Sequence, residues 1–313
     1  MEHPTNHSAA DKHLDRRWLK RQIGVWRSLA LVALTVLATV LALRYIDGGP
    51  SDGFSTGPHI ARLSIDGVIG TDSELLSRID KLSKNSDVVA VILRLNSPGG
   101  TYAGSEALYN ALRTLAEAKP TVAVIDGVAA SGAYMAAIAT DRIFARAGSI
   151  TGSIGVIMQM PNIKGLMDHI GVGYEAIRSA PLKATPTPFE DTSAASRVAA
   201  QDIVQDLFDQ FVERVKERRT LAATALDIVT SGRVFTGKQA MPLGLIDALG
   251  GETEATGWLE QHAEIAAGTR VFDAKSKDEA IQFRDLIERI GGTRFFGTQP
   301  MLDGPLAVWQ STI

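Results

Sequence analysis

Between residues 58 and 265, short apolar runs alternate with segments in which apolar residues recur at helical spacing. The runs predict strands over Ile60–Ile65, Val88–Leu95, Thr121–Ile125, Arg142–Ala145 and Ser153–Met158. The helical spacing predicts helices over Ser73–Leu82, Ser105–Ala118, Ala130–Ala139, Asn162–Ile170 and Ala194–Arg218. Strands separated by helices of about 10–15 residues indicate parallel βαβ units, so the predicted fold class is α/β.

Two further segments do not fit this alternation. Pro181, Pro186 and Pro188 lie together and predict a loop, because proline fits neither a regular helix nor a central strand. Beyond about residue 270 the pattern weakens, although Asp278–Ile290 is one more candidate helix. We therefore expect residues 266–313 to form a C-terminal extension that is partly disordered after Gly291.

The N-terminal part of the chain has the pattern of a membrane segment. Ser28–Leu43 contains no charged residue in 16 positions and is almost wholly apolar. This is slightly short of the roughly 20 residues that cross a bilayer. Trp26 and Tyr45 can lie at the interfaces and the flanking arginines can extend toward water, which lengthens the effective span. We predict one transmembrane signal anchor over residues 28–46.

The charges around this segment predict its orientation. Only Arg44 lies between the segment and Arg62, whereas a basic group precedes it, formed by Lys12, Arg16, Arg17, Lys20, Arg21 and Arg27. The positive-inside rule therefore places the tail, residues 1–27, in the cytoplasm and the chain after Ile46 outside it. The alternatives are a cleaved signal peptide and a buried core helix. The long basic region and the lack of a small-x-small cleavage site favour an uncleaved anchor, followed by a flexible linker over residues 47–57.

Composition narrows the possible chemistry. The net charge is −3 and the basic residues are scattered, so nothing indicates nucleic-acid binding. The chain has no cysteine, which excludes thiol nucleophiles, cysteine-bound zinc and disulfides. Outside the tail, the histidines His59, His169 and His262 lack the spacing of metal ligands. We predict no metal and no cofactor. If the chain is a hydrolase, its chemistry does not depend on histidine.

Two glycine-containing turns are candidate catalytic elements. Arg94–Gly100 and Asp126–Tyr134 each follow a buried strand and lead into a helix, and the crevices of parallel sheets lie at such strand ends. Ser131 in the second turn has small neighbours and is a candidate nucleophile. The N–H of Gly132, with one from the Pro98-Gly99-Gly100 turn, is placed to bind an oxyanion. The alternative is that Ser131 is an ordinary helix N-cap.

A serine without a histidine needs another base. Lys183 is the only charged residue between Arg178 and Glu190 and has apolar neighbours in sequence. A lysine can serve as the base where its surroundings keep the amine neutral. The alternative is a surface lysine whose apolar stem lies along the protein.

Five motifs occur in one order: Asn96–Gly100, Ala129–Gly132, Thr151–Val156, the lysine loop and Thr236–Gly251. Together they resemble the signal peptide peptidase A family, in its short single-module bacterial form. The resemblance covers about residues 58–265, the catalytic domain, together with the anchor. It implies a Clp protease/crotonase-like fold of repeated ββα units.

The resemblance also implies a role for each matching residue. Ser131 matches the nucleophile and Lys183 the general base, and Ser153 matches the residue that orients the lysine amine. Gly100 and Gly132 match the oxyanion donors. The chain departs from the family at Ala184, where an acidic or polar residue often follows the lysine, and in the proline content of this loop.

From the resemblance we expect a membrane-anchored serine endopeptidase that cleaves apolar peptides, chiefly signal peptide remnants, through an acyl-enzyme. We also expect a ring-shaped homo-oligomer, an octamer for the short form, in the inner membrane with its catalytic domain in the periplasm. Neighbouring subunits are candidates to complete the dyad. The alternatives are a regulatory membrane protease with specific protein substrates, a crotonase-like acyl-CoA enzyme, and a non-catalytic membrane scaffold.

Overall fold

The computed structural model describes residues 26, 29–35, 57–263, 265–274 and 306–308, which fall into two units, Met1–Phe54 and Ser55–Ile313. In the first unit residues 29–35 are helical, and their large apolar side chains, such as Leu31 and Leu34, are exposed. Across the described residues, no helix has the length and apolar character needed to span a bilayer. Most of the predicted anchor, tail and linker and the candidate helix Asp278–Ile290 lie outside the described residues.

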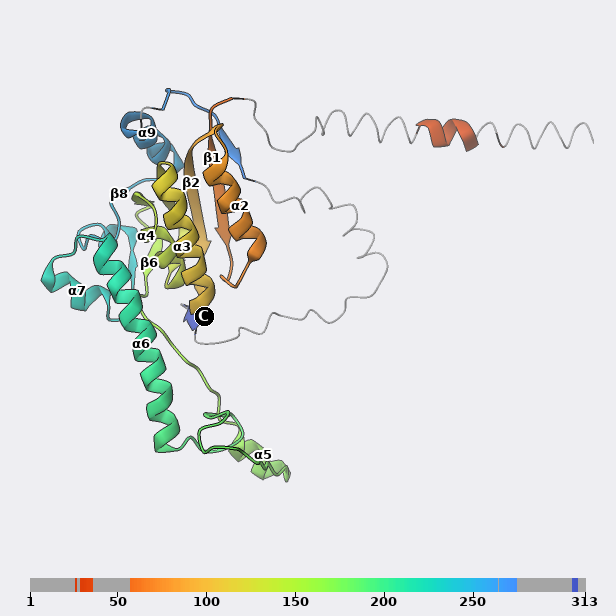
Figure 1. Cartoon of the computed structure of the whole chain (residues 1–313), viewed down its shortest axis with the longest axis vertical. Coiled ribbons are helices and arrows are strands. Elements are labelled where there is room, and N and C mark those ends of the chain that lie inside the picture. Colours follow the sequence, from red (N-terminus) through yellow and green to blue (C-terminus); the bar gives the residue numbers. More distant parts are fainter. Residues whose placement is uncertain (1–25, 27–28, 36–56, 264, 275–305, 309–313) are drawn as a thin grey trace, which may run out of the picture. The chain divides into compact units, whose positions relative to one another are not determined.

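The second unit is built on a mostly parallel sheet (Figure 1). Its described strands are β1 (His59–Asp66), β2 (Val88–Ser97), β4 (Thr121–Ala130), β5 (Arg142–Ala145), β6 (Ile150–Gly152), β7 (Val234–Thr236), β8 (Ala248–Leu249) and β9 (Val271–Asp273). The order is β7-β6-β4-β2-β1-β9, with β5 pairing to β4 and β8, and every pair is parallel except β6–β7. The α/β class predicted from the sequence is confirmed.

Helices cover both faces of the sheet. The described helices of this unit are α2 (Ser73–Lys84), α3 (Tyr102–Ala118), α4 (Gly132–Ile138), α5 (Lys164–Ile170), α6 (Ala194–Arg218), α7 (Ala223–Val229), α8 (Gly237–Ala240) and α9 (Glu252–His262), of which α5 lies away from the sheet. Alternate residues of one strand enter two different cores, because successive side chains point to opposite faces. Leu93 of β2 packs in the core shared with α3, α4 and α6, and Ile92 packs in the one that α9 closes. This two-sided burial explains the continuous apolar run of β2.

α3 shows how local sequence defines an element. The Thr101 side chain caps its N-terminus by accepting from the Gly104 N–H at 3.2 Å, and the helix ends just before Pro120. Its apolar stripe of Leu108, Leu112 and Leu115 is buried. The helix begins at Tyr102, three residues before the predicted start, because the cap and not the stripe determines where it starts.

The predicted strand Ser153–Met158 is wrong, and the strand lies instead at Ile150–Gly152. Gly152 has a φ of 89° and Ser153 a φ of 50°, and these left-handed conformations end the extended backbone. β4, in contrast, is longer than predicted, because Ala129 and Ala130 pair with β6. The strand pairing therefore continues into the serine-containing turn.

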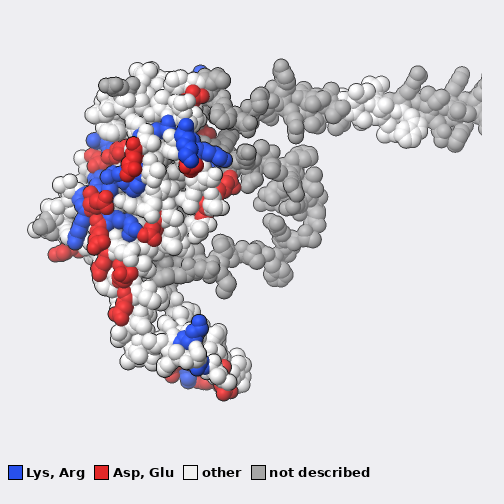
Figure 2. Space-filling view, in the orientation of Figure 1, with Lys and Arg blue, Asp and Glu red and all other residues white. Residues whose placement is uncertain are grey.

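The arm, residues 156–193, joins β6 to α6 and extends away from the sheet to the far end of α6 (Figure 1). It contacts itself through the Tyr174–Phe189 rings, 5.1 Å apart, and the Arg178–Glu190 ion pair at 2.7 Å. Charges are interspersed over α3 and α6, whereas much of the arm surface is uncharged (Figure 2). Its exposed large apolar side chains are those of Ile157, Met160, Leu166, Ile170, Val172, Tyr174, Ile177, Leu182 and Phe189.

The C-terminal half of α6 attaches the arm to the body. Phe211 and Val215 are buried in the main core. The Arg214 guanidinium donates to the Tyr102 hydroxyl at 2.9 Å and pairs with Glu106, and Arg218 donates to the Ile138 carbonyl at 3.0 Å. The N-terminal half of the helix, by contrast, is largely exposed or half-buried.

Candidate active site

Ser131 lies between β4 and α4, in a conformation that non-glycine residues rarely adopt. Its φ is 53° and its ψ −119°. Its backbone N–H donates to the Gly152 carbonyl at 2.8 Å, which fixes the turn against β6. Ser131 occupies the N-cap position of α4, but its hydroxyl makes no capping hydrogen bond and lies 3.5 Å from the Gly155 carbonyl. The ordinary N-cap interpretation is therefore not supported, and such strain is typical of functional sites.

The helix that follows Ser131 is a rigid support. Every residue from Gly132 to Ile138 is buried. The Tyr134 hydroxyl donates to the Leu245 carbonyl at 2.9 Å, and burial raises the pKa of this phenol, so that it remains a protonated donor. A strained serine is thus held by a helix with little freedom to move.

Gly100 belongs to β3 (Gly99–Thr101), which pairs with Ile69 along one edge. The Ile69 N–H donates to the Gly99 carbonyl at 2.8 Å, and the Thr101 N–H donates to the Ile69 carbonyl at 2.9 Å. Because N–H directions alternate along a strand, the Gly100 N–H points away from Ile69. A short strand, β10 (Leu306–Val308), pairs antiparallel with β3 and places Ala307 opposite Gly100.

The two glycines predicted as oxyanion donors lie close together. A Cβ atom added to Gly132 would be 3.4 Å from the Gly100 nitrogen. A Cβ atom on Gly100 would be 1.7 Å from the Ile69 carbonyl oxygen, so this position has no room for a side chain. Turns that are separate in sequence therefore meet beside Ser131, as the sequence predicts for the ends of adjacent parallel strands.

Ser153 also lies near this turn. It directly follows Gly152, the residue whose carbonyl binds the Ser131 N–H. Its own N–H donates to the Arg233 carbonyl at 2.8 Å, its φ is 50°, and it is buried. The structure thus brings Ser131, Gly132, Gly100 and Ser153 together.

Lys183 is not part of this group within one chain. It lies in the arm, it is exposed, and its described hydrogen bond is that of its backbone N–H with the Ala180 carbonyl, 3.0 Å long. Within the part of the chain that the structure describes, the Lys183 amino group has neither a polar partner nor a contact with Ser131. The apolar neighbours that the sequence shows around Lys183 therefore do not bury it in a single chain.

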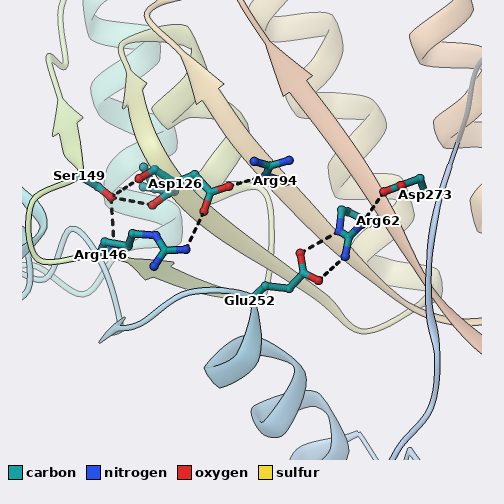
Figure 3. Close-up of polar contacts among 8 residues, drawn as sticks. Arg62, Arg94, Asp126, Arg146, Ser149, Glu252 and Asp273 are labelled. Atoms are coloured by element: carbon teal, nitrogen blue, oxygen red, sulfur yellow. Dashed lines mark hydrogen bonds and ion pairs between the residues drawn. The ribbon is translucent and has the colours of Figure 1, made fainter.

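Sequence reasoning missed a group of polar side chains that fixes the segment preceding β6. The Ser149 hydroxyl donates to the carbonyls of Ile125 and Asp126, at 2.8 and 2.9 Å (Figure 3). Asp126 in turn pairs with Arg94 and, at 3.6 Å, with Arg146. These contacts hold the β5–β6 connection against the middle of β4. The only sequence signal for them is that Ser149 precedes the Thr-Gly-Ser motif by two residues.

Figure 3 also shows a second group of ion pairs, centred on Arg62 of β1. The Arg62 guanidinium pairs with Glu252 of α9 and, at 2.7 Å, with Asp273 of β9. It connects the edge strand to the helix that covers the second face. No group of three or more metal-binding side chains occurs among the residues that the structure describes.

Comparison with known proteins connects this geometry to a family. Residues 113–266 match the family described as "Peptidase family S49". A protein of the cyanobacterium Synechocystis sp. named as a protease is 35% identical over 65% of this chain and 74% of its own length. A protein of Enterococcus faecium named as a signal peptide peptidase is 30% identical over 69% of this chain and 67% of its own length.

Longer relatives match as well. Protease 4 of Haemophilus influenzae is 32% identical over 73% of this chain, which spans 35% of that protein. A solved mutant of the 1510-N membrane-bound stomatin-specific protease aligns with 71% of this chain and 99% of its own, at a TM-score of 0.45 and 14% identity.

The close approach at Gly100 can be tested by substitution. Gly100→Ala places a methyl group against the Ile69 backbone, so we expect a lower melting temperature and a loss of about 3 kcal/mol or more of stability. Gly148→Ala is the matched control, since a Cβ atom there meets nothing within 4 Å. Thermal unfolding followed by circular dichroism measures both. Equal melting temperatures for the two variants would contradict the close approach.

Proposed function

The chain belongs to the signal peptide peptidase A family of serine peptidases, peptidase family S49, and from this premise we propose that Ser131 is its nucleophile and Lys183 its general base. The observation that carries the proposal is the strained Ser131, held beside the paired glycines Gly100 and Gly132. A backbone under this strain is expected where it exposes a nucleophile to its substrate.

In the proposed reaction, the neutral Lys183 amine accepts the Ser131 hydroxyl proton as the serine oxygen attacks the scissile carbonyl. The Gly100 and Gly132 N–H groups stabilise the oxyanion of the tetrahedral intermediate. The protonated lysine then donates to the leaving amine, and the peptide bond breaks to give an acyl-enzyme. The same amine activates a water molecule that hydrolyses the ester. Ser153 orients the amine.

We further propose that Lys183 acts on the Ser131 of a neighbouring subunit in a homo-oligomeric ring, an octamer. Two observations support this. Lys183 is exposed on the arm and has no contact with Ser131 of its own chain among the described residues. The arm also exposes nine large apolar side chains, among them Ile177 with 97% of its surface accessible, and an exposed apolar surface of this kind is typical of a protein interface.

The proposed substrates are apolar peptides, chiefly signal peptide remnants. The relative from Enterococcus faecium is named as a signal peptide peptidase, which supports this substrate class. A regulatory role in which the enzyme cleaves specific membrane proteins is the alternative. Both fit a catalytic domain held at the outer face of the inner membrane by residues 28–46, whose described helical part exposes Leu31 and Leu34.

The dyad predicts the behaviour of three variants. Ser131→Ala and Lys183→Ala should each lower kcat on a fluorogenic apolar peptide by about 10³-fold or more. Lys183→Arg should fail equally, because a guanidinium stays protonated and cannot accept the serine proton. Ser83→Ala and Lys84→Ala, on the exposed side of α2, are the matched controls and should keep full activity. Light scattering should show unchanged assembly, and hydrolysis by a dyad variant would contradict the assignment.

Mixing inactive chains distinguishes a dyad between subunits from one within a chain. When Ser131→Ala and Lys183→Ala chains are co-assembled in equal amounts, about one site in four pairs an intact serine with an intact lysine across a head-to-tail interface. We therefore expect about a quarter of the wild-type rate, measured on purified mixed oligomers. A dyad within one chain would leave the mixture inactive.

The orientation of the anchor can be tested with a reporter that is active only outside the cytoplasm. Fused after residue 50 it should be active. Inserted after residue 20 of the full chain, so that residues 28–46 still follow it, it should be inactive, because the basic residues retain the tail inside. Enzyme activity of the reporter in whole cells is the measurement, with protein levels checked by immunoblot. The reverse pattern would exclude the proposed topology.

A further inference from the structure

Ser105 carries a buried hydroxyl group without a partner. It lies near the start of α3 and has no accessible surface, and its Oγ atom makes no hydrogen bond. Several other buried hydroxyls of this domain are paired, such as those of Ser149 and Thr151, which donate to β4 carbonyls at 2.8 Å, whereas the Ser196 hydroxyl of α6 also has no partner among the described residues. Because an unpaired buried hydroxyl disfavours the folded state, such a group calls for an explanation.

The surroundings of this hydroxyl connect it to the candidate active site. A Cβ atom added to Gly132 would lie 2.0 Å from Ser105 Oγ and 2.8 Å from Ser105 Cβ, followed by the Gly100 nitrogen at 3.4 Å. The serine side chain therefore occupies the space in which a side chain at residue 132 would lie. It contacts the Gly132 backbone on the side that faces Gly100.

This contact lies between the two segments that contain the proposed oxyanion donors, β3–α3 with Gly100 and α4 with Gly132. Gly100 lies in β3, which leads directly into α3, and the Thr101 cap on the Gly104 N–H fixes that junction. Gly132 begins α4, whose residues are all buried. Ser105 thus belongs to the β3–α3 segment, which contains Gly100, and its side chain contacts α4, which begins with Gly132. The size of this side chain therefore determines the distance between the Gly100 and Gly132 N–H groups.

We propose that Ser105 is a positioning residue of the oxyanion hole, whose buried hydroxyl sets the spacing between the Gly100 and Gly132 N–H groups. The inference rests on the proposed function, because the hole has a role only if Ser131 is the nucleophile. A hydroxyl oxygen suits the position because it is smaller than a methyl group and can accept a weak contact from a glycine Cα–H. Alanine would remove the unpaired hydroxyl but leave the Gly132 backbone free to shift.

The first test is Ser105→Ala in the full chain. Oxyanion contacts form in the transition state, so kcat should fall while KM stays within about twofold. We expect a loss of about 10- to 100-fold, smaller than the loss of an oxyanion donor itself. The melting temperature should not fall, because the variant removes an unpaired buried group. Thr114→Val, which removes an exposed hydroxyl from the same helix, is the matched control and should keep the wild-type kcat.

The second test is a double-mutant cycle between the two contacting residues. Gly132→Ala alone should lose activity, because its methyl group meets the Ser105 side chain. Adding Ser105→Gly removes that side chain and leaves the Gly100 nitrogen, at 3.4 Å, as the nearest atom. The double variant should therefore recover at least about tenfold in kcat over Gly132→Ala, an interaction size usual for residues in contact.

The outcomes separate this inference from the proposed function. Ser131→Ala is measured in parallel, and full hydrolysis by that variant would overturn both, since the hole would then have no nucleophile. If Ser131→Ala is inactive while Ser105→Ala keeps the wild-type kcat, the role of Ser105 is excluded and the dyad stands. A double variant no more active than Gly132→Ala would likewise show that the contact does not position the hole.

Discussion

Two glycines of this protein, Gly100 and Gly132, are packed so closely against their neighbours that neither position has room for a side chain, and the surrounding fold of the domain maintains this packing. Gly100 lies against the Ile69 carbonyl, and Gly132 lies against Ser105. The packing around them is dense: β2 and β4 are buried on both faces over most of Val88–Leu93 and Thr121–Ile125, and α4 has no exposed residue. Dense packing of this kind can hold a strained residue such as Ser131, because every relaxation of its backbone would disturb the core.

Much of the framework was predictable because it follows from apolar periodicity. The helix Ala194–Arg218 has the bounds expected from its sequence, and the strand starts at Val88, Thr121 and Arg142 agree with the predicted ones. The segment Ser153–Met158 was misassigned because its apolar residues suit a strand, whereas the left-handed backbone at Gly152 and Ser153 does not. Periodicity reports which face is buried, and it carries no information on a single reversed φ.

The candidate site was predictable to a different degree at each residue. The glycines and Ser131 have sequence signals, because turns at the ends of parallel strands are recognisable from the sequence. Ser105 has none, since one serine in an amphipathic helix has no distinguishing neighbours and its contact with Gly132 arises from tertiary packing. The environment of Lys183 was also beyond sequence reasoning. Apolar neighbours in sequence do not bury a side chain when the whole segment extends from the body as an arm.

The attachment of α6 has a mechanical consequence. The helix packs against the body from Leu207 onward, and its first residue, Ala194, lies about 20 Å away at 1.5 Å per residue. Over such a lever, a tilt of only about 5° at the fixed end displaces the arm by about 2 Å, several times the tolerance of a hydrogen-bonded catalytic pair. Packing of the C-terminal half of α6 alone is therefore too imprecise to position the Lys183 side chain, which lies on the arm. Precise positioning of Lys183 requires a second contact at the far end of the helix, made by the apolar surface of the arm.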